Sequence, residues 1–455
     1  MKKNLLGCFG VIAMLVVLQF TQTETHAGLF DNIKPCDEVS ECNLGECNPC
    51  DNLCDDIAVT DCDPCGEIDA CNKKKSKWFV TGYLEAGFFA NEYGAKGLYN
   101  YNVATRPRRH FNPDSGNTKY LQNLDKTGGQ LNQLYISAGK SVDGKHGLDI
   151  GGTVDFTFGT DARFAQSAGL EYNAGHGLDS WGTGDYYSAF AQAYFEAAYK
   201  KWNVKIGKVA TPFGSNGYKS TERFFYSLSD TFAMGPATAL AAYATYTVND
   251  KLSVYAGWAQ PDQFGETSND NALLAGFNWQ VGKRLHVAYA LAVGENDRYK
   301  AATNFYNEYF VQSLVATYKI NRKWTYIFDW SLYNTNDKND IAKTQNNSGI
   351  YGINTELIYQ YNSKWAFGFR AGWGKDINNY LNANPNSILS TDNKYLFSLG
   401  ANWTPRQWLT IKSELRYDKF EDATAFNNLD DVGNWRADGG KTDQFSGGVS
   451  AIVKF

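Results

Sequence analysis

Long hydrophobic runs are missing from this 455-residue sequence beyond its first 27 residues, and the mean hydropathy is −0.44. A transmembrane helix needs about 20 consecutive apolar residues, so helical membrane spans are excluded from the rest of the chain. Proline is scarce, with 10 residues, whereas aromatic residues make up 15% of the chain. Low mean hydropathy with many aromatic residues is typical of strands that alternate between an apolar and a polar environment.

A strong charge excess and catalytic motifs are also missing. The net charge of −5 is too small to indicate nucleic acid or an acidic substrate as a partner. Of the five histidines only His286 lies in a predicted strand, and neither Gly-x-Ser-x-Gly nor His-Glu-x-x-His occurs. We therefore expect a protein that is not an enzyme and that has no cofactor.

The first 27 residues predict a secretory signal peptide. Lys2 and Lys3 supply the positive charge, residues 5–20 form the apolar segment, and Ala27 is a small residue suited to cleavage before Gly28. The chain is therefore expected to be exported.

Cysteine is absent after residue 71. Eight cysteines lie in an acidic segment, residues 28–77, that ends in a basic linker: Cys36, Cys42, Cys47, Cys50, Cys54, Cys62, Cys65 and Cys71. An even number of cysteines in a short exported segment predicts disulfides, which would supply the stability that a small core cannot. Two Cys-x-x-Cys pairs also have the spacing of a four-thiolate zinc site, and a third alternative is a cross-link to the cell wall or to another protein.

From residue 78 onward, polar and apolar residues alternate with the two-residue period of a strand. In WTYIFDWSL, residues 324–332, Trp324, Phe328 and Trp330 share a face opposite Asp329. In LTIKSELRYDK, residues 409–419, one face is apolar and the other carries full charges. The core of a β-sandwich would also give an apolar face, but bands of outward aromatic residues are more natural against lipid.

Short and long connections alternate along this part of the chain. The short turns are expected at residues 143–145, 200–201, 249–250, 282–284, 321–323, 362–364 and 404–406, and the long connections at about 91–130, 160–187, 211–238, 262–270, 295–307, 334–348, 375–393 and 419–443. Each segment between them has about ten residues, enough for a tilted strand to cross a bilayer. We predict an all-β, transmembrane, antiparallel up-and-down β-barrel of about 16 strands over residues 78–455, in a bacterial outer membrane.

Aromatic residues mark one end of the predicted barrel. Trp202, Trp324, Trp365 and Trp408 each follow a short turn, which predicts an aromatic girdle at one membrane interface. The last strand ends on Phe455 and must close against the first strand, at residues 78–90. Phe455 also resembles the C-terminal signal of outer-membrane proteins, which implies recognition by the barrel insertion machinery.

A barrel of 16 strands leaves an aqueous channel, so its inward charges are candidates for the pore lining. Asp149, Asp155, Arg370, Lys412 and Arg416 are the candidates chosen from the predicted strands. The other charges expected on the inward face are Glu85, Glu196, Lys205, Asp329, Glu356, Glu414, Asp418 and Lys454. The third long connection is too aromatic for a freely solvated loop, and we expect it to fold into the barrel. It would then present Lys219, Glu222, Arg223 and Asp230 to the pore. The alternative for this connection is a packed surface lid or a subunit contact. The alternative for the strand charges is that they form solvated ion pairs without a role in selectivity.

Two stretches resemble the OmpL-like beta-barrel porin family. IGKVATPFGSNGY, residues 206–218, is similar to a Gly-x-x-x-Thr-Pro-x-Gly stretch of that family, and YATYTVNDKLSVYAGWAQPD, residues 243–262, resembles its hairpin. The matching positions of the first stretch are Gly207, Thr211, Pro212 and Gly214. The resemblance covers residues 78–455 and implies a pore-forming outer-membrane protein without catalytic residues.

We therefore expect a porin for passive diffusion of small hydrophilic solutes or ions. Its expected partners are outer-membrane lipid and the insertion machinery, and analogy with 16-stranded porins favours a homotrimer. The alternative is a structural anchor whose cysteine-rich segment is cross-linked to the cell wall or to other proteins.

Overall fold

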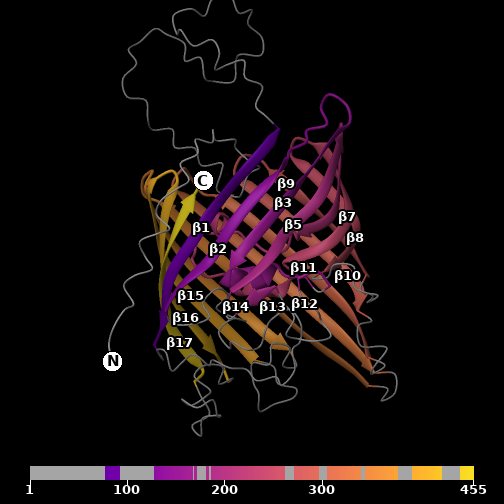
Figure 1. Ribbon diagram of the computed structural model, residues 1–455. Helices are drawn as coiled ribbons and strands as arrows, with labels where there is room; N and C mark the ends of the chain where they lie inside the picture. The colour runs from indigo at the N-terminus through magenta and orange to yellow at the C-terminus, as the bar shows by residue number, and fades with distance from the viewer. Residues whose placement is uncertain are drawn as a thin grey trace, which may run out of the picture.

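The computed structural model describes residues 77–92, 128–167, 169–171, 181–183, 186–261, 271–296, 305–339, 344–377, 392–422 and 441–455. These residues form a closed antiparallel barrel of 16 strands (Figure 1). The predicted fold class is therefore confirmed. The signal peptide and all eight cysteines lie outside the described residues, so disulfides and a cross-linked partner stay predictions. Among the residues that the structure describes, no helix is long and apolar enough to cross a membrane.

Each barrel strand pairs with its neighbours in chain order, and β17 pairs with β1 to close the sheet. The barrel strands are β1 (Trp78–Asn91), β2 (Gly128–Lys140), β3 (Asp149–Gly159), β5 (Tyr186–Tyr199), β6 (Trp202–Ala210), β7 (Thr238–Asn249), β8 (Leu252–Pro261), β9 (Asn271–Val281), β10 (Leu285–Asn296), β11 (Phe305–Lys319), β12 (Trp324–Asn339), β13 (Thr344–Gln360), β14 (Trp365–Ile377), β15 (Asp392–Arg406), β16 (Leu409–Phe420) and β17 (Asp443–Lys454). A two-residue strand, β4 (Gly182–Thr183), pairs only with β5. The described connections also hold three 3₁₀ helices, η2 (Thr160–Ala165), η3 (Ser220–Glu222) and η4 (Asp230–Met234).

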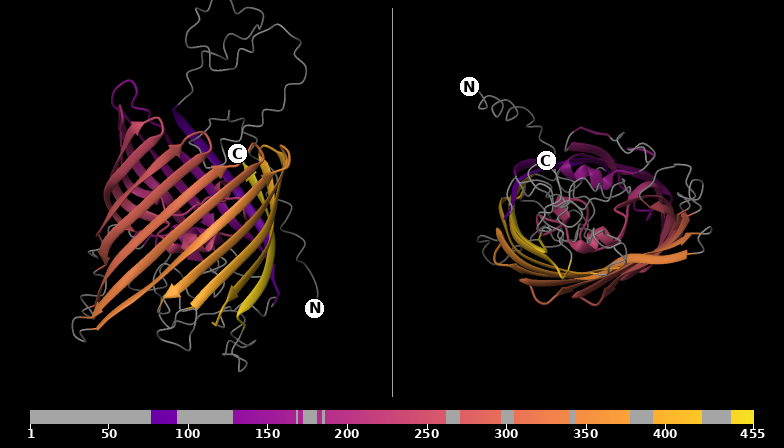
Figure 2. Two further views of the ribbon diagram at one scale, coloured as in Figure 1. Left: turned by 180° about the vertical axis from the view of Figure 1, so that it is seen from behind. Right: turned by 90° about the horizontal axis from the view of Figure 1, so that it is seen from below.

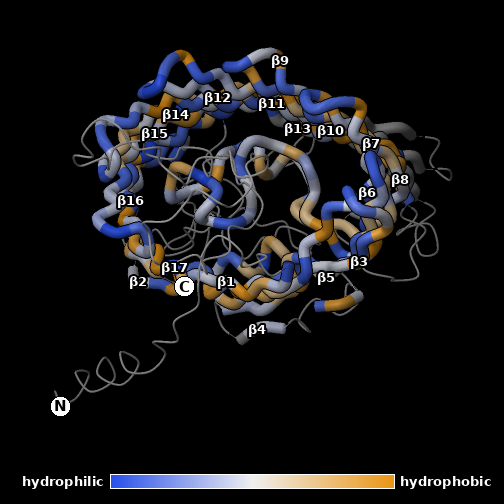
Figure 3. The backbone as a smooth tube through the Cα atoms, turned by 90° about the horizontal axis from the view of Figure 1, so that it is seen from above, coloured by the Kyte–Doolittle hydropathy of each residue, from blue (hydrophilic) through white to orange (hydrophobic). Residues whose placement is uncertain are grey.

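The alternation of the sequence sets which side chains face lipid. Phe195 and Leu415 on the outer face are 77% and 69% exposed, whereas Asp329 and Arg370 on the inner face are fully buried. Figure 3 shows hydrophobic and hydrophilic residues alternating along the strands. The closed sheet leaves no unpaired edge, which is the condition for spanning lipid with strands.

Six of the seven short turns lie within one residue of where the sequence predicts them. Residues 404–406 belong to β15, and the turn falls at residues 407–408. The strand continues because the Thr404 amide donates a hydrogen bond to the Lys364 carbonyl at 2.8 Å. Pro405, which has no N–H, sits at an irregularity of the ladder between Trp403 and Arg406, where a proline is tolerated.

One long connection is shorter than predicted. Strands β12 and β13 continue to Asn339 and from Thr344, so only residues 340–343 separate them instead of 334–348. The added residues are almost all polar, and their pairing therefore leaves no hydrophobic period in the sequence to reveal it.

The predicted closing contact between the two ends of the barrel is present. The Phe455 amide donates to the Gly82 carbonyl at 2.9 Å, and the Gly82 amide donates back at 2.8 Å. The Phe455 ring lies over Gly82, where any side chain would collide with it. Trp202, Trp324 and Trp365 begin their strands at this same short-turn end, which agrees with a girdle. Trp408 lies in the turn at residues 407–408 instead of following it. The role of Phe455 as an assembly signal stays a prediction.

Candidate functional site

The third long connection lies inside the barrel. We call residues 211–237, between β6 and β7, loop 3. Its helix η4 and neighbouring segments lie within the ring of strands (Figure 2, right). Its polar atoms bond to inward-facing groups of distant strands: Ser215 to Asp329 on β12, Ser227 to Glu414 on β16, and Tyr226 to Asn132 on β2. Loop 3 therefore crosses the interior and contacts several sides of the wall.

The first part of loop 3 is held by two buried carboxylates on β12 and β13. Asp329 accepts hydrogen bonds from the Ser215 amide at 2.7 Å and from the Thr231 hydroxyl at 2.8 Å. Glu356 accepts one from the Asn216 side chain at 3.1 Å. Hydrogen bonds of this kind compensate for moving a carboxylate out of water.

The middle of loop 3 is held by a network of charges on β14, β15 and β16. The Arg370 guanidinium donates to the Ser227 carbonyl at 2.9 Å and pairs with Glu414 at 2.7 Å. Arg416 donates to the Leu228 carbonyl at 2.8 Å and pairs with Asp418 at 2.7 Å. Lys394 and Asp230 complete the network: Asp230, on loop 3, pairs with both Lys394 and Arg416.

A third contact joins loop 3 to β1 and to the connection between β3 and β5. Arg223 lies 3.4 Å from Asp161 in η2 and 3.8 Å from Glu85 on β1. Gln133 donates a hydrogen bond to Asp161 at 2.9 Å. Burial of the carboxyl group raises the pKa of Asp161 to about 6, although the neighbouring Arg223 acts in the opposite direction.

Most residues that the sequence assigned to the pore are buried between loop 3 and the strands instead of facing open water. Six of them are at most 6% exposed: Asp155, Arg223, Asp230, Arg370, Lys412 and Arg416. The loop backbone inside the barrel needs hydrogen-bond partners, and the inward cations supply them. Lys412, for example, donates to the carbonyls of Ser220 and Arg223. A direct role of these six residues in lining the pore stays a prediction.

Two of the predicted residues keep contact with solvent inside the barrel. The side chains of Lys219 and Glu222 are 27% and 34% exposed, and their charged atoms are 3.7 Å apart. The Lys219 ammonium also lies 3.7 Å from Asp155 and 5.1 Å from the centre of the Tyr135 ring. Asp149 lies elsewhere, at the short-turn end, where it pairs with Lys77 and Lys140.

A similar but separate pair lies on β5 and β6. The Lys205 ammonium is 3.8 Å from Glu196 and 4.6 Å above the centre of the Tyr194 ring, and the Lys205 side chain is 27% exposed. The inner face therefore offers at least two lysine–carboxylate pairs to water, one on loop 3 and one on the wall.

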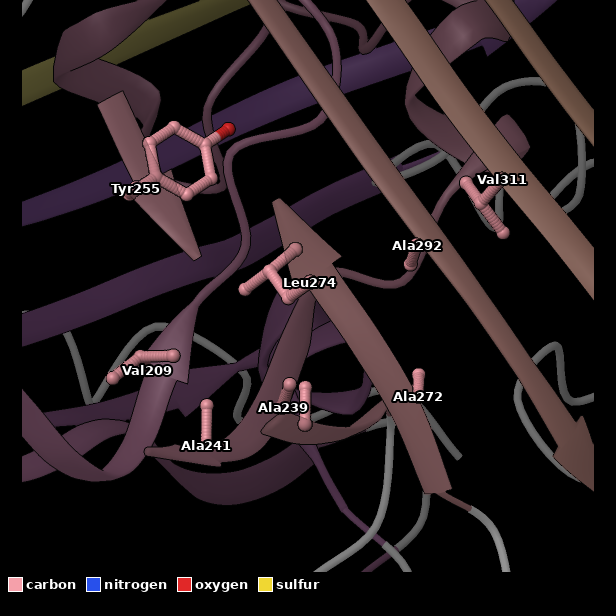
Figure 4. Close-up of a cluster of buried hydrophobic side chains, with 9 residues drawn as sticks. Val209, Ala239, Ala241, Tyr255, Ala272, Leu274, Ala292 and Val311 are labelled. Atoms are coloured by element: carbon pink, nitrogen blue, oxygen red, sulfur yellow. The ribbon is translucent and has the colours of Figure 1, made fainter. Parts of the chain in front are cut away.

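The two sides of the inner wall differ in chemistry. We call the inward faces of β12–β17, β1 and β2 the charged wall, and the inward faces of β6–β11 around one hydrophobic cluster the apolar wall (Figure 4). The buried members of that cluster are Val209, Ala239, Ala241, Tyr255, Ala259, Ala272, Leu274, Ala292 and Val311. Phe213 of loop 3 packs against them, so both walls contact the loop.

Sequence reasoning missed some members of the site. Lys394 lies on the inward face of β15, and the same alternation that revealed Arg370 could have revealed it. Asp161 lies in an irregular connection, where no period predicts that it meets Arg223. In the described ranges, no group of three or more His, Cys, Asp or Glu side chains could hold a metal ion.

The closed 16-stranded barrel, with its apolar outer face and a loop folded inside, defines an outer-membrane porin. The chain belongs to the family described as "Putative beta-barrel porin-2, OmpL-like", whose model matches residues 81–455. The resemblance noted in the sequence is thus confirmed, and the bacterial outer membrane is its location. Sequence comparison with curated proteins finds no match.

Two solved structures share the fold. The outer membrane channel DcaP of Acinetobacter baumannii has a TM-score of 0.53 and 12% sequence identity, with 83% of this chain and 97% of DcaP covered. The anion-selective porin from Comamonas acidovorans has a TM-score of 0.52 and 12% identity, with 84% of this chain and all of that porin covered. Because the family and the fold are those of channels, the alternative of a purely structural anchor is not favoured.

Proposed function

We propose that this porin passes small hydrophilic solutes and ions by passive diffusion, and that Lys219 and Glu222 of loop 3 form its charged constriction. The supporting observation is their partial exposure on a loop whose other charged groups are buried inside a closed barrel. Charged groups that keep contact with water in a channel act on passing ions, whereas buried groups already satisfied by hydrogen bonds act mainly on structure.

The local charge favours a weak preference for cations. Lys219 carries one positive charge, while Glu222 and the buried Asp155 each carry one negative charge within 3.7 Å of it. The preference is weak because each unit charge in water contributes only about 1 kcal/mol at contact distance. The anion selectivity named for the Comamonas acidovorans porin does not carry over at 12% identity.

Reversal potentials across a planar bilayer with a KCl gradient test this assignment. We expect a small preference of the wild-type channel for K⁺, a larger preference for Lys219→Gln, and a reduced or inverted preference for Glu222→Gln. Asp143→Asn, in an exposed short turn, is the matched charge-neutralising control and should leave the potential unchanged. Equal reversal potentials for all four proteins would overturn the assignment of the constriction.

A further inference from the structure

Three consecutive aromatic residues of loop 3 pack against the barrel wall at positions where the strands carry no side chain. Phe224, Phe225 and Tyr226 are at most 5% exposed. A methyl group at Gly368 would overlap the Phe224 ring, and one at Gly400 would lie 2.9 Å from the Phe225 ring. Real Cβ atoms essentially never approach another heavy atom this closely. The absence of side chains at Gly368 and Gly400 therefore leaves the space that these rings occupy.

The third ring follows the same pattern on β17 and β1. A Cβ at Gly448 would lie 2.8 Å from the Tyr226 ring, and one at Gly87 would lie 2.5 Å from its hydroxyl oxygen. None of the four glycines has the left-handed backbone that glycine favours. Space for the rings, and not backbone conformation, is therefore the reason for glycine at these positions.

Three of these glycines belong to one row across the sheet. Gly368 on β14 pairs with Gly400 on β15, Gly400 pairs with Glu414 on β16, and Glu414 pairs with Gly448 on β17. Glu414, the one side chain in the row, accepts hydrogen bonds from the Ser227 amide at 2.7 Å and from its hydroxyl at 2.8 Å. Four consecutive loop residues, 224–227, thus contact four consecutive strands, β14 to β17.

The row is connected to the exposed charges of loop 3. Asn402 on β15 donates a hydrogen bond to the Phe224 carbonyl at 2.9 Å. Lys412 on β16 donates to the Ser220 carbonyl at 2.6 Å and also to that of Arg223. Since Ser220 and Arg223 flank Glu222, a shift of the rings would move the Lys219–Glu222 pair.

We propose that Gly368, Gly400, Glu414 and Gly448 form a docking slot that positions loop 3, and with it the charged constriction. Glycine weakens a strand interior, so a row of three needs a compensating gain. The gain here is close packing of three rings and two hydrogen bonds to Glu414. This inference rests on the proposed function only for its effect on ions, because docking of the loop has a readout of its own.

Adjacent glycines of β17 supply a matched test. Gly448→Ala places a methyl group against Tyr226, whereas Gly447→Ala points outward and meets the Leu415 side chain at 3.1 Å and the Glu414 carbonyl at 3.2 Å. The measurement is tryptic cleavage at Lys219 and Arg223 in the purified, folded protein, quantified by mass spectrometry. We expect Gly448→Ala to speed this cleavage about tenfold or more and Gly447→Ala to leave it near the wild-type rate, because overpacking raises the population of the undocked loop. Equal rates in the two variants would overturn the proposal.

Two more variants keep the test decisive if Gly448→Ala fails to fold. Phe225→Ala removes a ring without adding bulk and should also speed cleavage. Gly400→Ala should speed cleavage in the wild-type background but have a clearly smaller further effect in Phe225→Ala, because the nearer ring is gone and only the Phe224 ring, 3.1 Å from the added methyl group, remains. Additive effects of the two changes would contradict a slot.

Ion measurements separate this inference from the proposed function. If docking positions the constriction, Gly400→Ala should also shift the KCl reversal potential, and Gly447→Ala should not. A wild-type protein that conducts no ions would refute the proposed function, while the cleavage comparison would still decide whether the slot exists.

Discussion

The charged wall and the apolar wall of this barrel contact loop 3 through different kinds of side chain. Both face a loop that brings backbone N–H and C=O groups into the interior. The charged wall meets the loop with carboxylates and guanidinium groups, such as Glu414 and Arg370, that bond to its backbone and hydroxyl groups. The apolar wall offers small residues such as Ala241 and Ala272, against which the Phe213 ring packs.

The comparison teaches that the inward charges of this barrel differ in their surroundings, because some are buried against loop 3 and others keep contact with water. On the charged wall, ionised side chains are buried and act as partners for the loop. The charges that keep contact with water include Lys219 and Glu222 on loop 3 itself and Lys205 on β6. Stability is therefore expected to depend mainly on the buried charges, and selectivity on the exposed charges together with the contacts that position them.

The largest effect is expected from Glu414→Ala on the charged wall. The change leaves Arg370 buried without its partner at 2.7 Å and removes the acceptor of the Ser227 amide. Breaking a buried pair in this way costs about 3–5 kcal/mol. The measurement is the free energy of unfolding in urea of protein folded into lipid vesicles.

Glu196→Ala is the matched control for that change. Its partners are Lys205, which lies 3.8 Å away and is partly exposed, and the Asn203 side-chain amide, which donates a hydrogen bond at 2.7 Å. Since no buried charge loses its partner, removal of Glu196 should cost about 1–2 kcal/mol, well below the loss for Glu414→Ala. Equal losses for the two glutamates would show that the charged wall does not hold the loop.

On the apolar wall, Leu274→Ala should lower the free energy of unfolding by about 3 kcal/mol, since Leu274 is 2% exposed and its removal leaves a cavity. The reversal potential should stay at the wild-type value, because no charge near the constriction changes. Glu414→Ala, in contrast, should alter both quantities. A shift of the reversal potential for Leu274→Ala would contradict the expectation that the apolar wall affects stability alone.

Asp161, in η2, makes the contact between loop 3 and the connection after β3 sensitive to pH. Its pKa of about 6 lies above its ordinary value of 3.8, so the folded protein holds the proton more tightly than the unfolded chain. The stability that this provides is fully present below about pH 3.8 and is lost as the pH rises through about 6. Relative to Asp161→Asn, the wild-type free energy of unfolding should fall by up to roughly 3 kcal/mol between these values. Parallel pH profiles of the two proteins would contradict this expectation.

The smallest effect is expected from Lys205→Gln. Its ammonium group is partly exposed and only loosely paired, so stability should change by less than about 0.5 kcal/mol. The KCl reversal potential should shift in the same direction as for Lys219→Gln but by less, because Lys205 lies on the wall and not on loop 3. A larger shift for Lys205→Gln would relocate the constriction to the wall.

Much of the fold could be predicted from the sequence, because lipid and water impose a two-residue period on every strand. Residues 324–332 show this period clearly, because Ile327, Asp329 and Ser331 are buried and the residues between them are not. The period fails where both faces are polar, as at the paired ends of β12 and β13. The last turn was also predicted too early in the chain, because strand β15 continues through Pro405 at an irregularity of the ladder.

The site was predictable only in part. The aromatic content of loop 3 indicated that it needs cover, and Lys219 and Glu222 were among its expected pore residues. The burial of Arg370 and Arg416 could not be predicted, since it depends on contacts with Ser227 across 143 and 189 residues of chain. The glycine row has the same origin: Gly368, Gly400 and Gly448 become neighbours only through strand register.

Single-channel recording of the purified wild-type protein in a planar bilayer tests the central claim most directly. The account predicts stable, ohmic current steps in KCl, because water reaches the partly exposed charges of loop 3 within a closed barrel. A folded, membrane-inserted protein that gives no current steps would contradict it.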